Sequence, residues 1–220
     1  IERLSALKLS DPKQFAQHDY DYLLARTAEV DGLTAAAMAN YHSVAQRNSV
    51  LRDYATAHLA RITRASGNLL LERIYLNELK MFTSDEDFRA GAEHRLARNA
   101  FESANYAEAI RLLNKSSNNS GKSSTANVLE ARAQLGEAYR MAGDVEKAKQ
   151  IFNELLDKMQ NPSQPDDAAL SAVKNLDAIN SNDASLGETE HWRRANIYQF
   201  NRYFDEAKFH FEAVFATNRE

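Results

Sequence analysis

Hydrophobic residues recur along most of the chain at intervals of three and four positions, with polar residues between them. This period matches the 3.6 residues per turn of an α-helix, where such positions share one face. Gly, Asp-Pro and Ser-Gly-Asn groups interrupt the pattern at about the length of one helix. The pattern predicts helices at residues 12–30, 34–47, 50–66, 69–82, 85–103, 106–115, 124–142, 145–160, 166–180, 188–201 and 204–217.

The composition supports helices throughout. Ala accounts for 35 of the 220 residues, Leu, Glu, Arg and Lys are also common, and Gly and Pro together total only ten. These frequent residues are strong helix formers, and the runs of Val, Ile and Thr that favour strands are missing. We therefore expect an all-α fold.

The interruptions between paired helices recur at nearly equal distances. They fall at Gly32, Gly67, Ala104 and Gly143, so the spacings are 35, 37 and 39 residues. A period of this length made of two antiparallel helices is typical of an α-solenoid. We expect one such domain over residues 1–220.

The period fails toward the C-terminus, since the matching positions Ala148 and Ala207 are 59 residues apart. An extra helix at 166–180 accounts for the difference, so we expect the array to be irregular after about residue 160. The chain also starts at Ile1 without Met and stops after a helical pattern, from which we expect a fragment of a longer protein.

Small and large residues alternate in a fixed register within the repeats. The first helix of each pair carries a small residue at Ala25, Ala60, Ala97 and Gly136. The second helix carries a small residue at Ala37, Ala109 and Ala148, with Glu72 as the exception, and a large one at Tyr41, Leu76, Leu113 and Phe152. We expect each small residue to be a notch into which a large residue packs.

This pattern resembles the tetratricopeptide repeat. The closest copy runs from Leu135-Gly136 through Tyr139 to Ala148 and Phe152, and the last copy contains Ala195, Tyr198, Ala207 and Phe211. The resemblance implies that the first helices face a concave groove. In that register lie His94, Arg98, Glu137, Arg140, Trp192, Asn196 and Gln199. They either bind a ligand or form a solvated surface.

Charge and Cys content exclude several classes of function. The formal net charge of −4 disfavours binding along a phosphate backbone, so no nucleic acid is expected as a partner. No run of 18 apolar residues occurs, so no membrane span is expected. With no Cys there is no disulfide, thiolate zinc site or cysteine nucleophile, and the compartment is left open.

No catalytic motif is complete. Asn118–Ser123 ends like a phosphate-binding loop but lacks the preceding Gly and strand, and the six His lack metal-site spacing on one helix face. Glu102-Ser103 resembles the catalytic acid of lytic transglycosylases, but the Gly-Leu-Met-Gln-like stretch that follows it in those enzymes is missing. We expect no catalytic residue, cofactor or metal.

Two segments extend the resemblance. Residues 41–71, and 190–211 with Glu190-His191-Trp192-Arg193-Arg194-Ala195, are similar to the repeat region before the catalytic domain of bacterial soluble lytic murein transglycosylases. The resemblance implies a non-catalytic periplasmic scaffold that contacts its catalytic domain, another protein or peptidoglycan glycan strands. Two alternatives stay open: a generic tetratricopeptide adaptor, cytoplasmic or not, and an enzyme whose site is scattered over the repeats.

Overall fold

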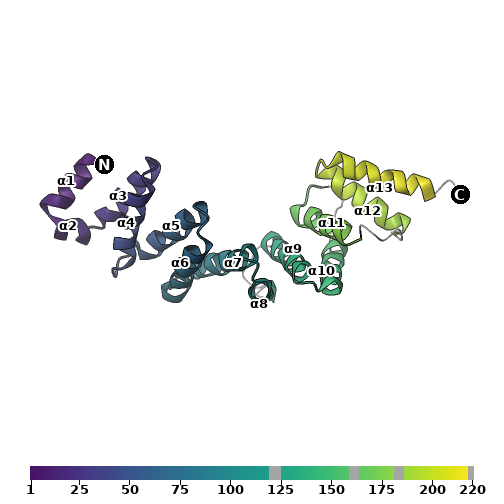
Figure 1. Cartoon of the computed structure of the whole chain (residues 1–220), viewed down its shortest axis with the longest axis horizontal. Coiled ribbons are helices and arrows are strands. Elements are labelled where there is room, and N and C mark those ends of the chain that lie inside the picture. Colours follow the sequence, from purple (N-terminus) through teal and green to yellow (C-terminus); the bar gives the residue numbers. More distant parts are fainter. Residues whose placement is uncertain (119–124, 159–163, 181–185, 218–220) are drawn as a thin grey trace. The chain divides into compact units, whose positions relative to one another are not determined.

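The computed structural model describes residues 1–118, 125–158, 164–180 and 186–217. In these ranges every regular element is an α-helix, which confirms the all-α expectation (Figure 1). The helices are α1 Glu2–Ser10, α2 Pro12–Gln17, α3 Tyr20–Val30, α4 Thr34–Ala45, α5 Arg52–Ala65, α6 Leu69–Phe82, α7 Glu86–Glu102, α8 Tyr106–Asn118, α9 Thr125–Met141, α10 Val145–Asp157, α11 Asp167–Asn180, α12 Glu188–Phe200 and α13 Phe204–Thr217.

The chain forms two compact units, Ile1–Ser103 and Ala104–Glu220. In the first unit, α3 packs against α4 and α5 packs against α6. Contacts between α4 and α5 stack these two pairs on each other, and α6 then packs against α7. In the second unit, α9 pairs with α10 and α12 with α13. The single domain over residues 1–220 stays a prediction.

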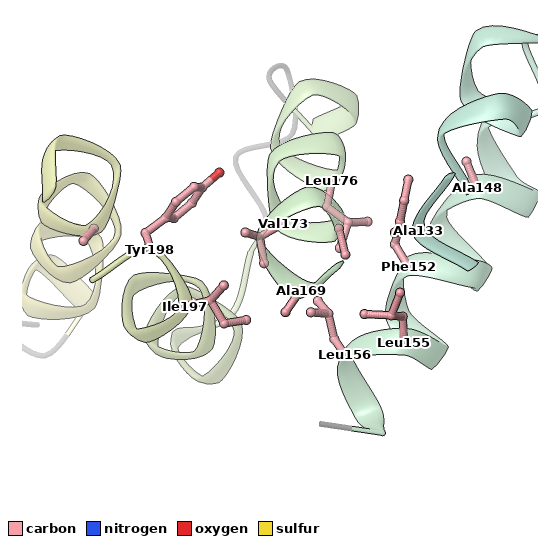
Figure 2. Close-up of a cluster of buried hydrophobic side chains, with 12 residues drawn as sticks. Ala133, Ala148, Phe152, Leu155, Leu156, Ala169, Val173, Leu176, Ile197 and Tyr198 are labelled. Carbon is pink, nitrogen blue, oxygen red and sulfur yellow. The ribbon is translucent and has the colours of Figure 1, made fainter. Parts of the chain in front are cut away.

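The extra helix predicted at 166–180 is α11, and it joins the two helix pairs of the second unit. It contacts α9 and α10 on one side and α12 on the other. Figure 2 shows Ala169, Val173 and Leu176 of α11 between the side chains of α10 and those of α12. The helix that breaks the period therefore supplies the centre of this unit's core.

The breaks predicted from the repeat are turns with a left-handed residue. A positive φ occurs at Gly32 (73°), Gly67 (75°), Ala104 (56°), Gly143 (90°) and Arg202 (65°). After three of the glycines, a backbone N–H reaches the carbonyl five residues earlier; from Asp144 to Tyr139 this bond is 2.9 Å. Such bonds satisfy carbonyls at a helix end, which explains why Gly recurs there.

Notch-and-knob packing is confirmed at Gly136 and Phe152, and the other small residues of the register are buried as expected. The small residues of the first helices are buried at Ala25, Ala60, Ala97, Gly136 and Ala195. Phe152 is fully buried against Gly136: a Cβ built on that glycine would lie 2.5 Å from Cε1 of the phenyl ring. Phe211, the corresponding residue of the last repeat, is half-buried.

The single helix predicted at 12–30 is wrong. The chain forms α2 and α3 instead, separated at Asp19, whose φ is 53°. The Asp19 carboxylate accepts hydrogen bonds from Ser49 at 2.7 Å and from Arg47 at 3.1 Å. These long-range bonds hold the break, and the local hydrophobic period does not reveal them.

The structure differs from the predicted helices in two further places, one additional helix and one longer helix. Helix α1 was not predicted, because it buries no residue and so has no clear apolar face. It contacts α2 and α3, and the ammonium of Lys8 lies 2.7 Å from Asp21 and 2.8 Å from Asn40. Helix α8 runs to Asn118, beyond the predicted end at 115. Most of the Asn118–Ser123 segment weighed as a phosphate loop lies outside the described residues.

Candidate functional site

The first helices of the repeats present charged side chains next to their buried notches. We call α3, α5, α7, α9 and α12 the A helices. In the first unit the residue directly after each notch is an arginine, namely Arg26, Arg61 and Arg98, with side chains 47%, 53% and 59% exposed. Arg64 lies one turn after Arg61 and is 26% exposed. We call these four residues the arginine strip.

Two carboxylates connect the arginine strip across three A helices. Glu29 on α3 lies 3.5 Å from Arg26 and also pairs with Arg61 on α5. Glu102 on α7 accepts hydrogen bonds from Arg64 on α5 at 2.5 Å and from Arg98 at 3.0 Å. Glu72, which pairs with Arg95 as well as with Arg64, adds one carboxylate and one guanidinium group. The five guanidinium groups of this network therefore exceed its three carboxylates by two positive charges.

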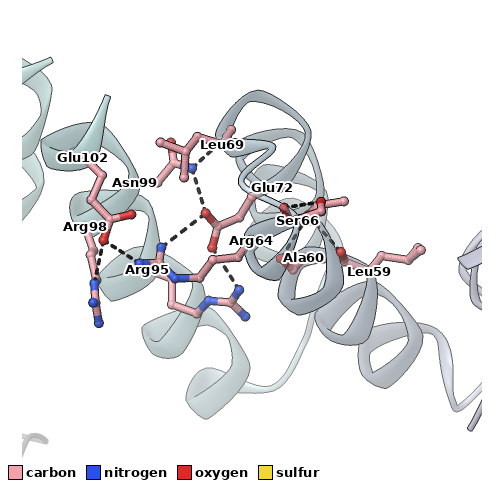
Figure 3. Close-up of polar contacts among 11 residues, drawn as sticks. Leu59, Ala60, Arg64, Ser66, Leu69, Glu72, Arg95, Arg98, Asn99 and Glu102 are labelled. Carbon is pink, nitrogen blue, oxygen red and sulfur yellow. Dashed lines mark hydrogen bonds and ion pairs between the residues drawn. The ribbon is translucent and has the colours of Figure 1, made fainter. Parts of the chain in front are cut away.

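A buried carboxylate, that of Glu72, contacts Arg64 of the strip (Figure 3). Glu72 of α6 is fully buried at the position where other repeats have Ala. It accepts hydrogen bonds from Arg95 and from the Asn99 amide at 2.9 Å each, and from Arg64 at 3.4 Å. The Asn99 amide also donates to the Leu69 carbonyl at 2.7 Å. Glu72 therefore links α6 to α5 and α7, and it contacts the Arg64 guanidinium from the buried side of the helices.

Glu102, the residue weighed as a catalytic acid, is a member of this ion-pair network. Burial alone would raise its pKa, but hydrogen bonds from Arg64 and Arg98 together lower the pKa of this carboxyl below its usual value. A general acid needs the opposite shift, since it must hold a proton near neutral pH. The carboxylate of Glu102 is accordingly ionised and serves to join α5 to α7.

The candidate residues of the sequence analysis are divided between the two units. His94 and Arg98 lie in the first unit, on α7, where His94 is half-buried. The other five lie in the second unit. The sequence analysis missed Arg26, Arg61 and Arg64. The same register contains them, because Arg26 and Arg61 directly follow the notches Ala25 and Ala60, and Arg64 lies four residues after Ala60.

Glu137 and Arg140 line a pocket of about 430 Å³ between α9 and α11. Asp167, Ser171, Lys174 and Asn175 of α11 complete its polar lining. The Nε of Arg140 donates to the Asn175 side-chain oxygen at 2.7 Å, which fixes the guanidinium at the pocket wall. The sequence carried no signal for the α11 residues, because helix 166–180 lies outside the repeat period.

Trp192, Asn196 and Gln199 follow one face of α12. Trp192 is 53% exposed, and its indole forms a T-shaped pair with the Phe211 ring at a centroid distance of 5.4 Å. Gln199 is exposed, but the amide of Asn196 donates to the Trp192 carbonyl at 2.7 Å. The face therefore offers an accessible aromatic surface with one amide still facing solvent.

A buried polar cluster joins α11, α12 and α13. Asp177 accepts hydrogen bonds from the Tyr198 hydroxyl at 2.5 Å and from Nε2 of His210 at 3.2 Å, and it pairs with Arg194. Burial raises the pKa of Tyr198 strongly, and the bond to Asp177 adds to the rise. On the other side of His210, its Nδ1 lies 2.9 Å from Nδ1 of His191. The sequence does not predict this cluster, because its members are up to 33 residues apart.

The described residues contain no cluster that could hold a metal ion and no helix that could cross a membrane. No three His, Asp or Glu side chains gather there closely enough to hold a metal ion. No helix in the described ranges has the length and apolar character needed to cross a membrane.

Comparison with known proteins identifies the fold. No protein-family model and no curated protein matches the chain. The solved structures that match include two crystal structures from Podosopora anserina, both titled as a putative kinesin light chain with nearly identical TPR-like repeats, one of them a single-residue variant. They are 21% and 20% identical to this chain, cover 93% and 91% of it and 98% and 94% of their own length, and have TM-scores of 0.55 and 0.54. The fold is a TPR-like α-solenoid, as expected.

Proposed function

We propose that this chain is a non-catalytic interaction domain that binds another protein through the exposed faces of its A helices. The TPR-like fold supports this proposal, since stacked repeats build extended binding surfaces. The observation that carries it is the arginine strip, which places half-exposed cationic side chains side by side on three successive A helices. The arginine side chains are not needed for core packing, because the small residues directly before them are already fully buried.

Peptide selection tests the proposal without knowledge of the partner. The full chain is used to select peptides from a random library, and the enriched peptides are retested on variants. We expect Arg61→Gln or Trp192→Ala to weaken their binding, and Arg73→Gln on α6, outside the A helices, to leave it unchanged. Failure to enrich any sequence, or equal binding by all three variants, would refute the proposal.

The resemblance of residues 41–71 and 190–211 to lytic murein transglycosylases motivates a finer proposal. In it, the chain is the superhelical scaffold of a periplasmic enzyme of that kind and contacts glycan strands through α12. The half-exposed indole of Trp192 supports this, because an indole face suits the apolar face of a sugar ring. The exposed amide of Gln199 can exchange hydrogen bonds with hydroxyl and acetamido groups.

The finer proposal has its own assay. Trp192 is the only Trp of the chain, so fluorescence reports on this position alone. We expect soluble muropeptides to shift its emission, and we expect no anhydromuropeptides after incubation with purified peptidoglycan. If millimolar muropeptides leave the emission unchanged, only the generic adaptor is supported; if anhydromuropeptides are released, the chain is an enzyme with a site scattered over the repeats.

A further inference from the structure

We infer that the arginine strip binds an acidic peptide segment whose carboxylates alternate with neutral residues. This inference rests on the proposed function and specifies the chemistry of the partner. It starts from the surplus of positive charge along Arg26, Arg61, Arg64 and Arg98. The chain as a whole does not share that surplus, since the formal net charge of its 220 residues is −4.

The arginines of the strip keep hydrogen-bond donors for a ligand. Arg98 binds Glu102 through Nε, while Arg26 and Arg61 each bind Glu29 through a terminal nitrogen. A guanidinium carries five N–H donors in a planar fork, so each group retains donors after its internal pairing. About half of each of these three side chains is exposed to solvent. A second carboxylate can therefore bind without breaking the existing pairs.

His58 does not add to the charge of the strip. Its Nε2 lies 3.2 Å from Arg26 and its Nδ1 3.3 Å from Arg61. Burial, followed by the charge of Arg26, lowers the pKa of His58 below its usual value. The imidazole is neutral at pH 7, so the surplus belongs to the arginines and changes little between about pH 7 and 8.

The carboxylates within the strip determine the spacing of the ligand. Glu29 lies between Arg26 and Arg61, and Glu102 lies between Arg64 and Arg98. An extended peptide places residues i and i+2 on one side, roughly 7 Å apart. Acidic residues at that spacing can face successive guanidinium groups, and the neutral residues between them avoid the strip's own carboxylates.

A nucleic acid fits this surface less well than such a peptide. A nucleic acid carries a phosphate at every nucleotide, whereas a peptide can vary its sequence and place neutral residues opposite Glu29 and Glu102. Backbone binding also draws on a broad excess of basic residues, which this acidic chain lacks. The alternation of charge along the strip therefore favours a peptide.

The test measures binding of defined peptides to the full chain by fluorescence anisotropy. The probe is a labelled peptide of alternating Glu and Ser, and the matched probe has Gln in place of every Glu. We expect binding of the Glu probe only, weakened as salt rises from about 0.05 M to about 0.3 M, because exposed ion pairs are screened. Each Arg→Gln change should weaken it on the order of two- to fivefold.

The variants isolate the strip from overall charge. Arg26→Gln, Arg61→Gln and Arg98→Gln are combined, and the control combines Arg3→Gln, Lys13→Gln and Arg73→Gln, which lower the net charge equally elsewhere in the first unit. We expect the strip variant to lose roughly tenfold or more in affinity and the control to lose little. If the triple variant unfolds, Arg61→Gln and Arg98→Gln are used singly.

Three results would overturn the inference: no binding of the Glu probe, equal binding of the Gln probe, or equal affinity of the strip variant. Binding of an oligothymidylate that is lost in the same strip variant would assign the surface to nucleic acid instead. None of these results would refute the proposed function, provided that peptides selected from the random library still need the A-helix residues for binding. Failure of that selection would remove both.

Discussion

Replacing Gly136 by Ala tests the packing register at its tightest point. The added Cβ would lie 2.5, 2.8 and 2.9 Å from three ring atoms of Phe152. Real Cβ atoms do not approach carbon so closely, and the ring is fully buried with the second unit's core around it (Figure 2). Either helix α9 must move away from α10 or the ring must leave its preferred rotamer.

Two opposing effects set the size of the change. In a helix interior, Ala is favoured over Gly by about 1 kcal/mol. Forcing extra volume into a packed core costs about 1–3 kcal/mol, and contact with three ring atoms places Gly136→Ala toward the upper end of that range. We therefore expect a net loss of about 1–2 kcal/mol in the free energy of unfolding.

Urea unfolding followed by circular dichroism measures this loss, and Gly91→Ala is the matched control. Gly91 is exposed in the interior of α7, and a Cβ there would meet nothing within 4 Å. The same substitution should therefore stabilise the protein by about 0.5–1 kcal/mol. In a Phe152→Leu background, Gly136→Ala should cost less, because the ring that it strikes is gone. Gains of equal size at both glycines would refute the register.

Three further predictions concern the polar networks. Glu72→Ala introduces the residue that the other repeats carry, yet we expect the free energy of unfolding in urea to fall by about 2–3 kcal/mol, because the partners of Glu72 lose a buried acceptor. In the control Glu146→Ala, where the side chain is 87% exposed, the free energy of unfolding should change by less than about 0.5 kcal/mol. Tyr198→Phe removes the 2.5 Å bond to Asp177 and should cost about 1–2 kcal/mol in the same assay, with Tyr203→Phe nearly neutral. Burial, then the charges of His210 and Arg194, lower the pKa of His191 in the folded chain, so as the pH falls the unfolded chain binds a proton at His191 before the folded chain does. Stability should therefore fall as pH drops below about 6.5, and His191→Gln should reduce that fall. An unchanged pH profile in His191→Gln would contradict the lowered pKa of His191.

The repeat architecture could be predicted from the sequence because it is written in local features. Left-handed turn residues, helix periodicity and the notch residues recur at 35 to 39 residues, and each has a physical cause that acts within one repeat. The interruption at Asp19 could not be predicted in this way. Its side chain is held by Arg47 and Ser49, about thirty positions away, and only the folded chain brings them together.

The candidate site divides along the same line. The arginine strip was within reach of the sequence, since Arg26 and Arg61 occupy the register that selected Arg98. The pocket beside Arg140 was not, because six of its eight lining residues come from α11, whose phase relative to the repeats is visible only in three dimensions. Register identifies residues that share a face, and tertiary packing decides which of them have partners.

Glu72 shows how a departure from the repeat pattern relates to the surface. At the notch position of α6 an Ala would suffice for close packing, as it does in the other repeats. The carboxylate instead reaches Arg64, which is thereby held between Glu72 below and Glu102 beside it. Since a buried charge needs partners, Arg95, Asn99 and Arg64 together satisfy Glu72, and Arg64 is oriented in return by both Glu72 and Glu102. The repeat that departs from the pattern is thus the one in which the core helps to position the arginine strip, and loss of Glu72 should disturb acidic-peptide binding even where the fold survives.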